Sequence, residues 1–128
     1  DRVTAYATAG GLDYATLNDS VGNDTLTFIG GVAALGDVGG TFLNSASGFE
    51  GVFANSNKGG VDSADLRDTS GDDTFSGSTN TALLTTPAHG FIKAMDYESV
   101  RAESSLGGND DADVAATDYV FSQVGAWV

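Results

Sequence analysis

The sequence predicts an all-β protein, a right-handed parallel β-helix with about two coils per 49-residue repeat and a short C-terminal capping helix. The first supporting observation is a repeat: residues 3–26 return at 52–75, and 11 of the 24 paired positions are identical. The second is that retained and rewritten residues alternate, the period of a strand with one face inside. The third is composition, since 18 glycines and 15 aspartates against three glutamates favour short strands and turns over helices.

The repeat also fixes the expected domain organisation. Copies start near residues 3, 52 and 100, and the third copy is shifted by 48 positions instead of 49. A repeat unit of this size buries its apolar face against its neighbours. We therefore expect one domain, with β-solenoid repeats over residues 1–114 and a C-terminal cap over residues 115–128.

The first half of each unit predicts two strands joined at a Gly-Gly turn. Apolar residues alternate over 3–7, glycines 10 and 11 suit a turn, and alternation resumes over 13–19. The retained residues of the second strand are expected to be buried and to stack in register from copy to copy: Ala15, Leu17, Ala64, Leu66, Ala112 and Val114. The rewritten neighbours are expected to face solvent: Tyr14, Thr16, Ser63, Asp65 and Asp111.

The second half of each unit is less regular and is expected to add further short strands. In the first copy these fall near residues 25–29, 33–35 and 42–46, with a turn at glycines 39 and 40. Aromatic residues recur at matching places, Phe42 with Phe91 and Phe49 with Tyr97. We interpret these aromatic side chains as anchors of the core.

The C-terminal segment predicts a helix that closes the stack. Val120, Val124 and Trp127 lie at helical spacing, and Thr117 or Asp118 suits the N-cap. Terminal repeats are usually atypical because they cover an otherwise open core. Trp127 is accordingly expected to act as a lid.

The net charge limits the classes of binding partner that we expect. Five basic residues against 18 acidic ones give a formal charge of −13. Nucleic acid and anionic membrane surfaces attract cationic patches, so neither is an expected partner, whereas divalent cations are favoured. No stretch approaches the roughly 20 apolar residues of a membrane span, so membrane insertion is not expected. The absence of cysteine excludes disulfides and thiolate metal sites.

Six aspartates are the candidate metal ligands, and calcium is the candidate cofactor. They are Asp13, Asp19, Asp24, Asp62, Asp68 and Asp73. One interpretation is that they close turns by accepting backbone N–H bonds. The other is calcium, because Asp13 and Asp19 share the inward parity of Ala15 and Leu17. Stacked coils would then gather carboxylates at a corner, which is costly without a cation.

We expect no enzymatic activity, although a fragment of a polysaccharide-active β-helix enzyme is an alternative. The single histidine, His89, follows the single proline in a predicted loop, where a histidine is usually solvated. Arg67, between Asp65 and Asp68, is the only place with the basic and acidic groups such an enzyme needs. Its counterpart in the first copy is Asn18, which indicates a freely varied surface position.

A carbohydrate-binding module is the second alternative, with extracellular polysaccharide as the partner. Such a module needs two or three exposed aromatic side chains in a row. Tyr6 and Tyr14 are outward candidates, but their counterparts are Asn55 and Ser63. No aromatic track is therefore expected to continue from copy to copy.

The repeat resembles those of known bacterial proteins. The pattern Val-x-Ala-x-Ala-Thr-x-Gly-Gly-x-Asp-x-Ala-x-Leu-x-Asp-Ser-x-Gly-Asn-Asp-Thr-Phe is similar to tandem repeats of very large secreted or surface proteins of planctomycete-type bacteria. The half motif Gly22-Asn23-Asp24-Thr25-Leu26 more weakly resembles the calcium nonapeptide of repeats-in-toxin proteins. The resemblance to the large bacterial surface proteins implies an extracellular or cell-surface location and a structural or adhesive role.

The expected partners are therefore neighbouring repeats or copies of the same protein, assembled end to end. The chain opens in mid-repeat, where later copies carry an aromatic residue before the first strand. An uncovered first coil exposes unpaired backbone, which recruits further strands. We expect Val3, Ala5 and Ala7 to form part of a joint with a preceding repeat or with another subunit.

Overall fold

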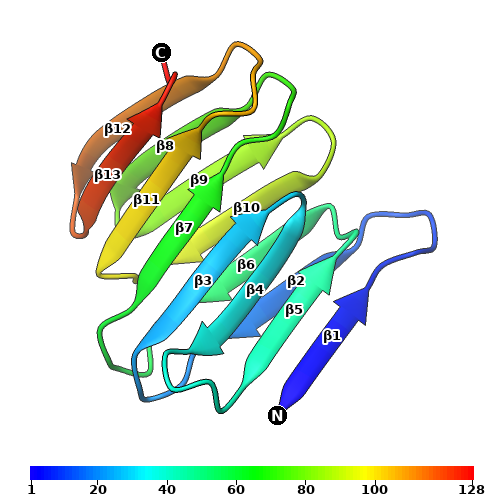
Figure 1. The fold of residues 1–128 in the computed structure, drawn as a ribbon, viewed down its shortest axis with the longest axis vertical. Helices are drawn as coiled ribbons and strands as arrows, with labels where there is room; N and C mark the ends of the chain where they lie inside the picture. Colours follow the sequence, from blue (N-terminus) through cyan, green and yellow to red (C-terminus); the bar gives the residue numbers. More distant parts are fainter.

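The computed structural model, which describes residues 1–128, is built from β-strands that form two facing sheets (Figure 1). Its strands are β1 (Arg2–Tyr6), β2 (Tyr14–Asn18), β3 (Asp24–Ile29), β4 (Val32–Asp37), β5 (Leu43–Ser47), β6 (Gly51–Asn55), β7 (Ser63–Arg67), β8 (Thr74–Thr79), β9 (Thr81–Thr86), β10 (Gly90–Met95), β11 (Ser99–Ser104), β12 (Asp111–Thr117) and β13 (Val120–Gly125). The structure contains no helix, and hence none suited to crossing a membrane. The all-β prediction is confirmed.

The two sheets are those of a β-solenoid with antiparallel additions. One sheet has seven strands in the order β1-β5-β4-β3-β7-β11-β13, and the other has six in the order β12-β8-β9-β10-β6-β2. Neighbouring strands are parallel except within the segments β3-β4-β5 and β8-β9-β10, which are antiparallel. Each of these segments steps ahead along the stack and folds back, so the strand after it pairs with the strand before it: β6 with β2, and β11 with β7.

The chain crosses between the sheets three times per repeat. The first copy runs through the seven-stranded, six-stranded and again seven-stranded sheet, and the second copy takes the opposite course. Three crossings, at two per circuit, make about one and a half circuits, where two were expected. Equivalent strands of successive copies therefore lie in opposite sheets.

This alternation overturns one prediction about packing. The residues of β2, β7 and β12 do not stack on one another in register, because these strands never pair. Leu17 pairs instead with Ala54 on β6, and Leu66 pairs with Ala102 on β11. The right-handed sense of the coil stays a prediction.

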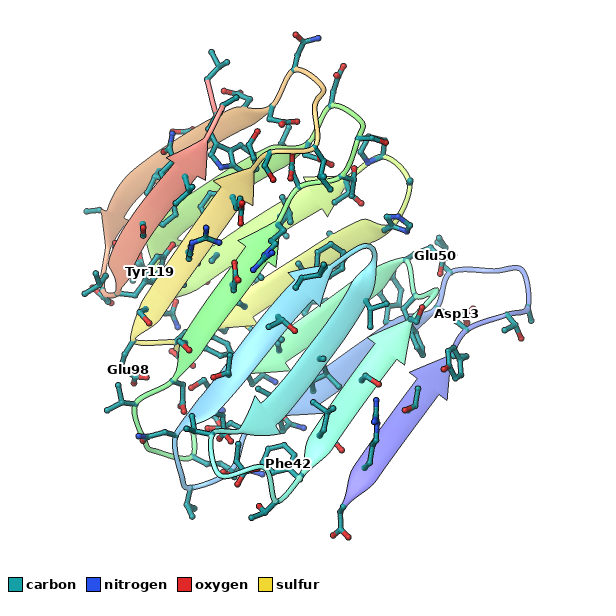
Figure 2. All side chains as sticks on the ribbon, in the orientation of Figure 1. Asp13, Phe42, Glu50, Glu98 and Tyr119 are labelled. Carbon is teal, nitrogen blue, oxygen red and sulfur yellow. The ribbon has the colours of Figure 1, made fainter.

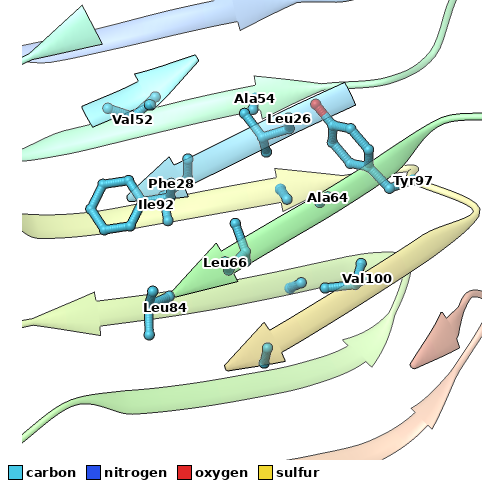
Figure 3. Packing of buried hydrophobic residues seen from close by; sticks show 14 of the residues in the cluster. Leu26, Phe28, Val52, Ala54, Ala64, Leu66, Leu84, Ile92, Tyr97 and Val100 are labelled. Carbon is cyan, nitrogen blue, oxygen red and sulfur yellow. The ribbon is translucent and has the colours of Figure 1, made fainter. Parts of the chain in front are cut away.

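The predicted alternation of inward and outward residues is confirmed in β2, β7 and the first half of β12, although the outward residues Ser63 and Asp65 are half-buried and not exposed. Leu17, Ala64 and Leu66 are buried, while Tyr14 and Thr16 are exposed. Strands β2 and β12 lie at the two ends of the six-stranded sheet. Their inward residues are half-buried: Ala15, Ala112 and Val114. Twenty buried residues form one continuous core between the sheets, part of which is shown in Figure 3.

The aromatic residues expected to anchor the core divide into two groups. Tyr97 is buried in the core, and Phe42 and Phe49 pack against it from half-buried positions. Phe91 instead contacts Phe53, with ring centroids 5.5 Å apart, outside that core. The inward residue at this point of β10 is its neighbour Ile92.

The predicted capping helix is wrong: the C-terminal segment forms a strand. β13 pairs in parallel with β11 over six residue pairs, from Ser99 with Val120 to Ser104 with Gly125. Three apolar residues at helical spacing are a weak signal beside an open backbone edge that offers a full ladder of hydrogen bonds. Thr117 does not cap a helix, since its hydroxyl donates to the carbonyl of Tyr119. Trp127 is buried, as its expected role as a lid requires.

Candidate metal centre

Six buried aspartates gather into two clusters of three. The first consists of Asp19, Asp24 and Asp62, and the second of Asp68, Asp73 and Asp110. Within each cluster one carboxylate oxygen of every residue lies within 4.8 Å of the others. All six aspartates are at most 3% exposed, so each cluster places three carboxylates together in the protein interior.

Each cluster is made by two loops from successive repeats. An acid-pair loop, Asp19–Asp24 or Asp68–Asp73, supplies two aspartates and links strands of opposite sheets. A single-acid loop, Ser56–Asp62 or Ser104–Asp110, supplies the third aspartate from the following copy. The clusters are therefore joints between repeats.

The two clusters lie on opposite sides of the sandwich. The first cluster lies where β3 and β7 begin, and the second lies where β7 and β11 end. Figure 2 shows Glu98, whose carboxylate accepts the Asp62 amide at 2.6 Å, on the side opposite Asp13 and Glu50. Successive joints thus alternate between the two sides, as the three crossings per repeat require.

Hydrogen bonds hold the first cluster in place. The Asp24 amide donates to Asp62 Oδ1 at 2.6 Å, which ties the two loops together. The Ser20 amide donates to Asp24 Oδ2 at 2.7 Å, and the Lys58 amide donates to Asp19 Oδ2 at 2.8 Å. The Ser56 hydroxyl donates to Asp62. The aspartates therefore do close the turns, as one of the two sequence interpretations expected.

The second cluster repeats this pattern. The Asp73 amide donates to Asp110 Oδ1 at 2.9 Å, and the Thr69 amide donates to Asp73 Oδ2 at 2.6 Å. The Ser104 hydroxyl donates to Asp110 Oδ2 at 2.6 Å. Asp68 Oδ2 accepts two amides, at 2.9 and 2.7 Å, from the residues that follow Ser104.

The hydrogen bonds leave one oxygen in each cluster without a donor. Asp19 Oδ1 and Asp68 Oδ1 are fully buried and have no hydrogen-bond partner. All four ion pairs of the molecule join Arg67 and Arg101 to acids outside the clusters. Three buried carboxylates without a basic partner repel one another strongly. Turn closure therefore accounts for only part of the arrangement.

Burial also perturbs the protonation of one member of the second cluster, Asp73. The pKa of Asp73 is raised, chiefly because burial disfavours the charged carboxylate. Its hydrogen bonds from Thr69 act in the opposite direction, whereas the negative charges of Asp110 and Asp68 raise the pKa further. A cation bound among the three would remove this cost.

A tyrosine hydroxyl accompanies the first cluster. The Tyr97 hydroxyl is buried without a hydrogen-bond partner, and burial followed by the charges of Asp62, Asp19 and Asp24 raises its pKa. The phenol is therefore neutral at physiological pH. Figure 3 shows Tyr97 at the margin of the core.

Trp127 takes the matching place beside the second cluster. The amide of Glu98, which follows Tyr97, donates to the Asp62 carbonyl, and the amide of Val128, which follows Trp127, donates to the Asp110 carbonyl. Trp127 Nε1 donates to the Ala102 carbonyl at 3.2 Å. The second cluster thus has a satisfied indole where the first has a free hydroxyl.

Five of the six candidate ligands lie in the clusters, but the grouping differs from the expected one. Asp13 lies apart from Asp19 and Asp24, because it belongs to a single-acid loop on the opposite side of the sandwich. Asp110 joins Asp68 and Asp73 and was not among the candidates. Its alignment with Asp13 and Asp62 in the third copy was the available signal.

The donor set suits a hard divalent cation. Each cluster offers carboxylate and hydroxyl oxygens, without histidine or cysteine. Oxygen-only sites favour calcium, magnesium or manganese over zinc and copper. The residues present therefore fit the calcium expected from the sequence.

The one site that suggested polysaccharide chemistry forms a network of ion pairs. Arg67 contacts Asp65 at 2.9 Å and Glu103 at 3.5 Å, and Arg101 contacts the same two acids at 3.0 and 2.7 Å. These four outward side chains link β7 to β11. His89 lies in the loop between β9 and β10 and packs over Gly31.

The outer face of the six-stranded sheet carries an aromatic patch that the sequence comparison missed. Tyr14, Phe53 and Phe91 lie on β2, β6 and β10, with ring centroids 5.5 to 6.3 Å apart. Their rings cover Gly51, where an added Cβ would lie 2.5 Å from Phe91 and 2.6 Å from Tyr14. Comparing equivalent positions overlooked the patch because its members occupy different positions of the repeat.

Comparison of the chain with protein-family models, with curated proteins and with solved structures finds no match.

Proposed function

We propose that this chain is a structural or adhesive repeat module of a secreted or cell-surface bacterial protein, stabilised by calcium and assembled by end-to-end stacking of its repeats. The observation that carries the proposal is the pair of buried three-aspartate clusters at the joints between repeats. An ion at such a joint binds two repeats at once. Calcium would therefore stabilise the stack and not a single unit.

Calcium is favoured over other cations by the chemistry of each cluster. Three carboxylates supply three negative charges, and calcium takes six to eight oxygen ligands in flexible geometry. Magnesium demands a near-ideal octahedron and retains several waters, which suits a closed cluster poorly. Extracellular calcium modules work at dissociation constants of about 0.1–1 mM, which agrees with the proposed location.

The proposal assigns the chain no catalytic role. It includes the right-handed winding that parallel crossover connections adopt, and the structural role implied by the resemblance to large bacterial surface repeats. The buried core and the ion-pair network on the outer face of β7 and β11 support a scaffold.

Thermal unfolding at constant ionic strength tests the calcium proposal. Because a ligand that binds only the folded state stabilises it, the melting temperature should rise with free calcium and fall with chelator. Asp19→Asn should remove the response of the first cluster, and Asp68→Asn that of the second. Asp113→Asn, an exposed acid of β12, is the control and should respond like the native chain. A melting temperature indifferent to calcium would overturn the proposal.

The aromatic patch supports a second candidate, a carbohydrate-binding module. Tyr14 is 55% exposed, so part of its side chain is accessible to a sugar. The rings are inclined to one another by 43° to 80°, however, which suits packing over Gly51 better than a flat stacking platform. Tyr14→Ala should weaken retention on immobilised polysaccharide, whereas Tyr6→Ala, at a 70% exposed tyrosine on β1, should not. Equal retention of both variants would exclude the patch.

A further inference from the structure

The chain has a third single-acid loop, Ala7–Asp13, that faces no acid-pair loop. It corresponds to the loops Ser56–Asp62 and Ser104–Asp110 in the later copies. We propose that this loop, with strands β1 and β2, docks another β-repeat unit whose exposed loop has the sequence Asp-Ser/Thr-x-Gly-Asn/Asp-Asp. This deepens the proposed stacking by naming the partner's chemistry.

A glycine in this loop lacks the partner that its counterparts in the other two loops contact. An added Cβ at Gly60 would lie 2.1 Å from the Gly22 carbonyl oxygen, and one at Gly108 would lie 1.9 Å from the Gly71 carbonyl oxygen. Both glycines therefore let a partner loop approach. Their counterpart Gly11 also has a positive φ, of 138°, but no atom lies within 4 Å of its added Cβ.

Hydrogen-bond donors of this loop are likewise unmatched. In the first joint the amides of Lys58 and Val61 donate to Asp19 Oδ2 and Asn23 Oδ1, both at 2.8 Å. The corresponding amides of the open loop, those of residues 9 and 12, have no acceptor.

The acceptor of the open loop is unmatched as well. Asp62 Oδ1 and Asp110 Oδ1 each accept an amide from the partner loop, at 2.6 and 2.9 Å. The carboxylate of Asp13 accepts none, although its own amide is already held by Glu50 Oε2 at 2.8 Å, as Glu98 holds Asp62. One half of the joint is thus in place.

The strands beside the loop can receive the rest of the partner. β1 and β2 are the end strands of their two sheets, at the same end of the sandwich (Figure 1). A hollow between them is lined by half-exposed apolar residues, including Val3, Ala5 and Ala15. A unit that added a parallel strand to each, as β7 and β8 lie beside β11 and β12, would present its acid-pair loop to Ala7–Asp13.

A second copy of this chain does not provide the partner loop. Both of its acid-pair loops are already engaged in its own joints. The third copy has Ala115-Ala116-Thr117 after Val114, where the others have the acid pair. The occupant is therefore another repeat unit with a free acid-pair loop, carried on the same polypeptide or on a different one.

An extended chain tests this inference. Residues Val52–Ser99, placed again in front of Val3, continue the repeat in phase and bring a second Asp68–Asp73 loop opposite Ala7–Asp13. Amide hydrogen exchange at residues 9 and 12 should slow by about ten-fold or more in the extended chain relative to the original. Exchange that stays as fast, with the added unit folded, would overturn the inference.

Substitutions in both chains distinguish docking from general stabilisation. Gly11→Ala should lower the melting temperature more in the extended chain, because only there does the new Cβ meet a carbonyl oxygen. Thr8→Ala, an exposed residue of the same loop, should cost the same in both chains. Equal effects of Gly11→Ala would contradict the inference.

The same measurements with chelator and with calcium separate this inference from the cation proposal. Slow exchange in both solutions supports loop docking even if calcium has no effect on melting. Sedimentation of the original chain should show a monomer. A dimer with slow exchange at residues 9 and 12 would show that a second copy is the occupant and would overturn the proposed partner.

Discussion

Asp73 shows a conflict within the second cluster at the scale of a single residue. Its carboxylate is fully buried and holds the loop together through bonds from Thr69. The same burial raises its pKa, and the neighbouring charges of Asp68 and Asp110 raise it further. The carboxylate that holds the loop together is therefore in surroundings that disfavour its charged form when no cation is bound.

This conflict predicts a pH dependence in chelator. The folded-state pKa of Asp73 is raised above its unfolded value, so its contribution to stability is present below the unfolded pKa of 3.8 and is lost as pH rises through the folded pKa. Asp73→Asn should remove this loss, so that the variant's free energy of unfolding depends less on pH between acid and neutral conditions. Urea unfolding over a pH series measures this. Asp113→Asn is the control, and equal slopes for Asp73→Asn and the native chain would contradict the expectation.

Tyr97 provides a second test at this scale. Its hydroxyl is buried without a partner beside the first cluster, and Phe49 takes its place in the preceding copy. An unsatisfied buried polar group costs about 1–3 kcal/mol. Tyr97→Phe should therefore maintain or raise the stability of the chelated protein, as measured by urea unfolding. A large loss would show that the hydroxyl has a partner that holds the joint.

Leu66 tests the core itself. It is fully buried on β7, in contact register with Phe28 on one side and Ala102 on the other. Leu66→Ala should cost about 2–5 kcal/mol as a cavity. Asp65→Ala, the outward neighbour in a partly exposed ion-pair network, should cost about 0–1 kcal/mol. Chemical denaturation of the two variants compares the inward and outward faces of one strand, and equal costs would contradict the assignment of faces.

At the scale of elements, a strand's two faces were predictable but its neighbours were not. Alternation along residues 13–19 follows from side-chain geometry within a strand, and it holds in β2 and β7. Which strand lies beside β2 depends on how often the chain crosses between sheets, and a repeat length of 49 residues does not specify that number. The antiparallel segments add strands to each repeat without adding a circuit, so the number of coils per repeat was overestimated.

The C-terminal strand shows the same limit. Residues 120–127 have apolar spacing compatible with a helix, and only the open edge of β11 decides for a strand. Gly125 ends this strand at φ 91°, where an added Cβ would lie 1.7 Å from the Ser104 carbonyl oxygen.

Substitution of this glycine tests the strand. Gly125→Ala should destabilise the chain more than Gly107→Ala, because Gly107 shares a positive φ but has open surroundings. The difference in melting temperature isolates the clash with β11. Equal losses would argue against the β11–β13 pairing.

At the scale of the whole molecule, the candidate site depended on long-range geometry. Five of the acids were found from the sequence because stacked coils must bring inward carboxylates together. Their grouping was not found, since it joins the acid pair of one copy to a single acid of the next, 38 residues beyond Asp24 and 37 beyond Asp73. The excess negative charge at each joint was predictable from the sequence. Which aspartates form each cluster could be learned only from the fold.

The one and a half circuits per repeat also determine how a longer array would present its surface. Each added unit is turned by half a revolution relative to the last, so a feature encoded in every copy emerges alternately on the two broad faces. Only every second copy, about 98 residues apart at twice 49, looks in the same direction. A filament of such units would therefore present the same features on both broad faces. A ligand that binds one face would find its binding site only at every second unit.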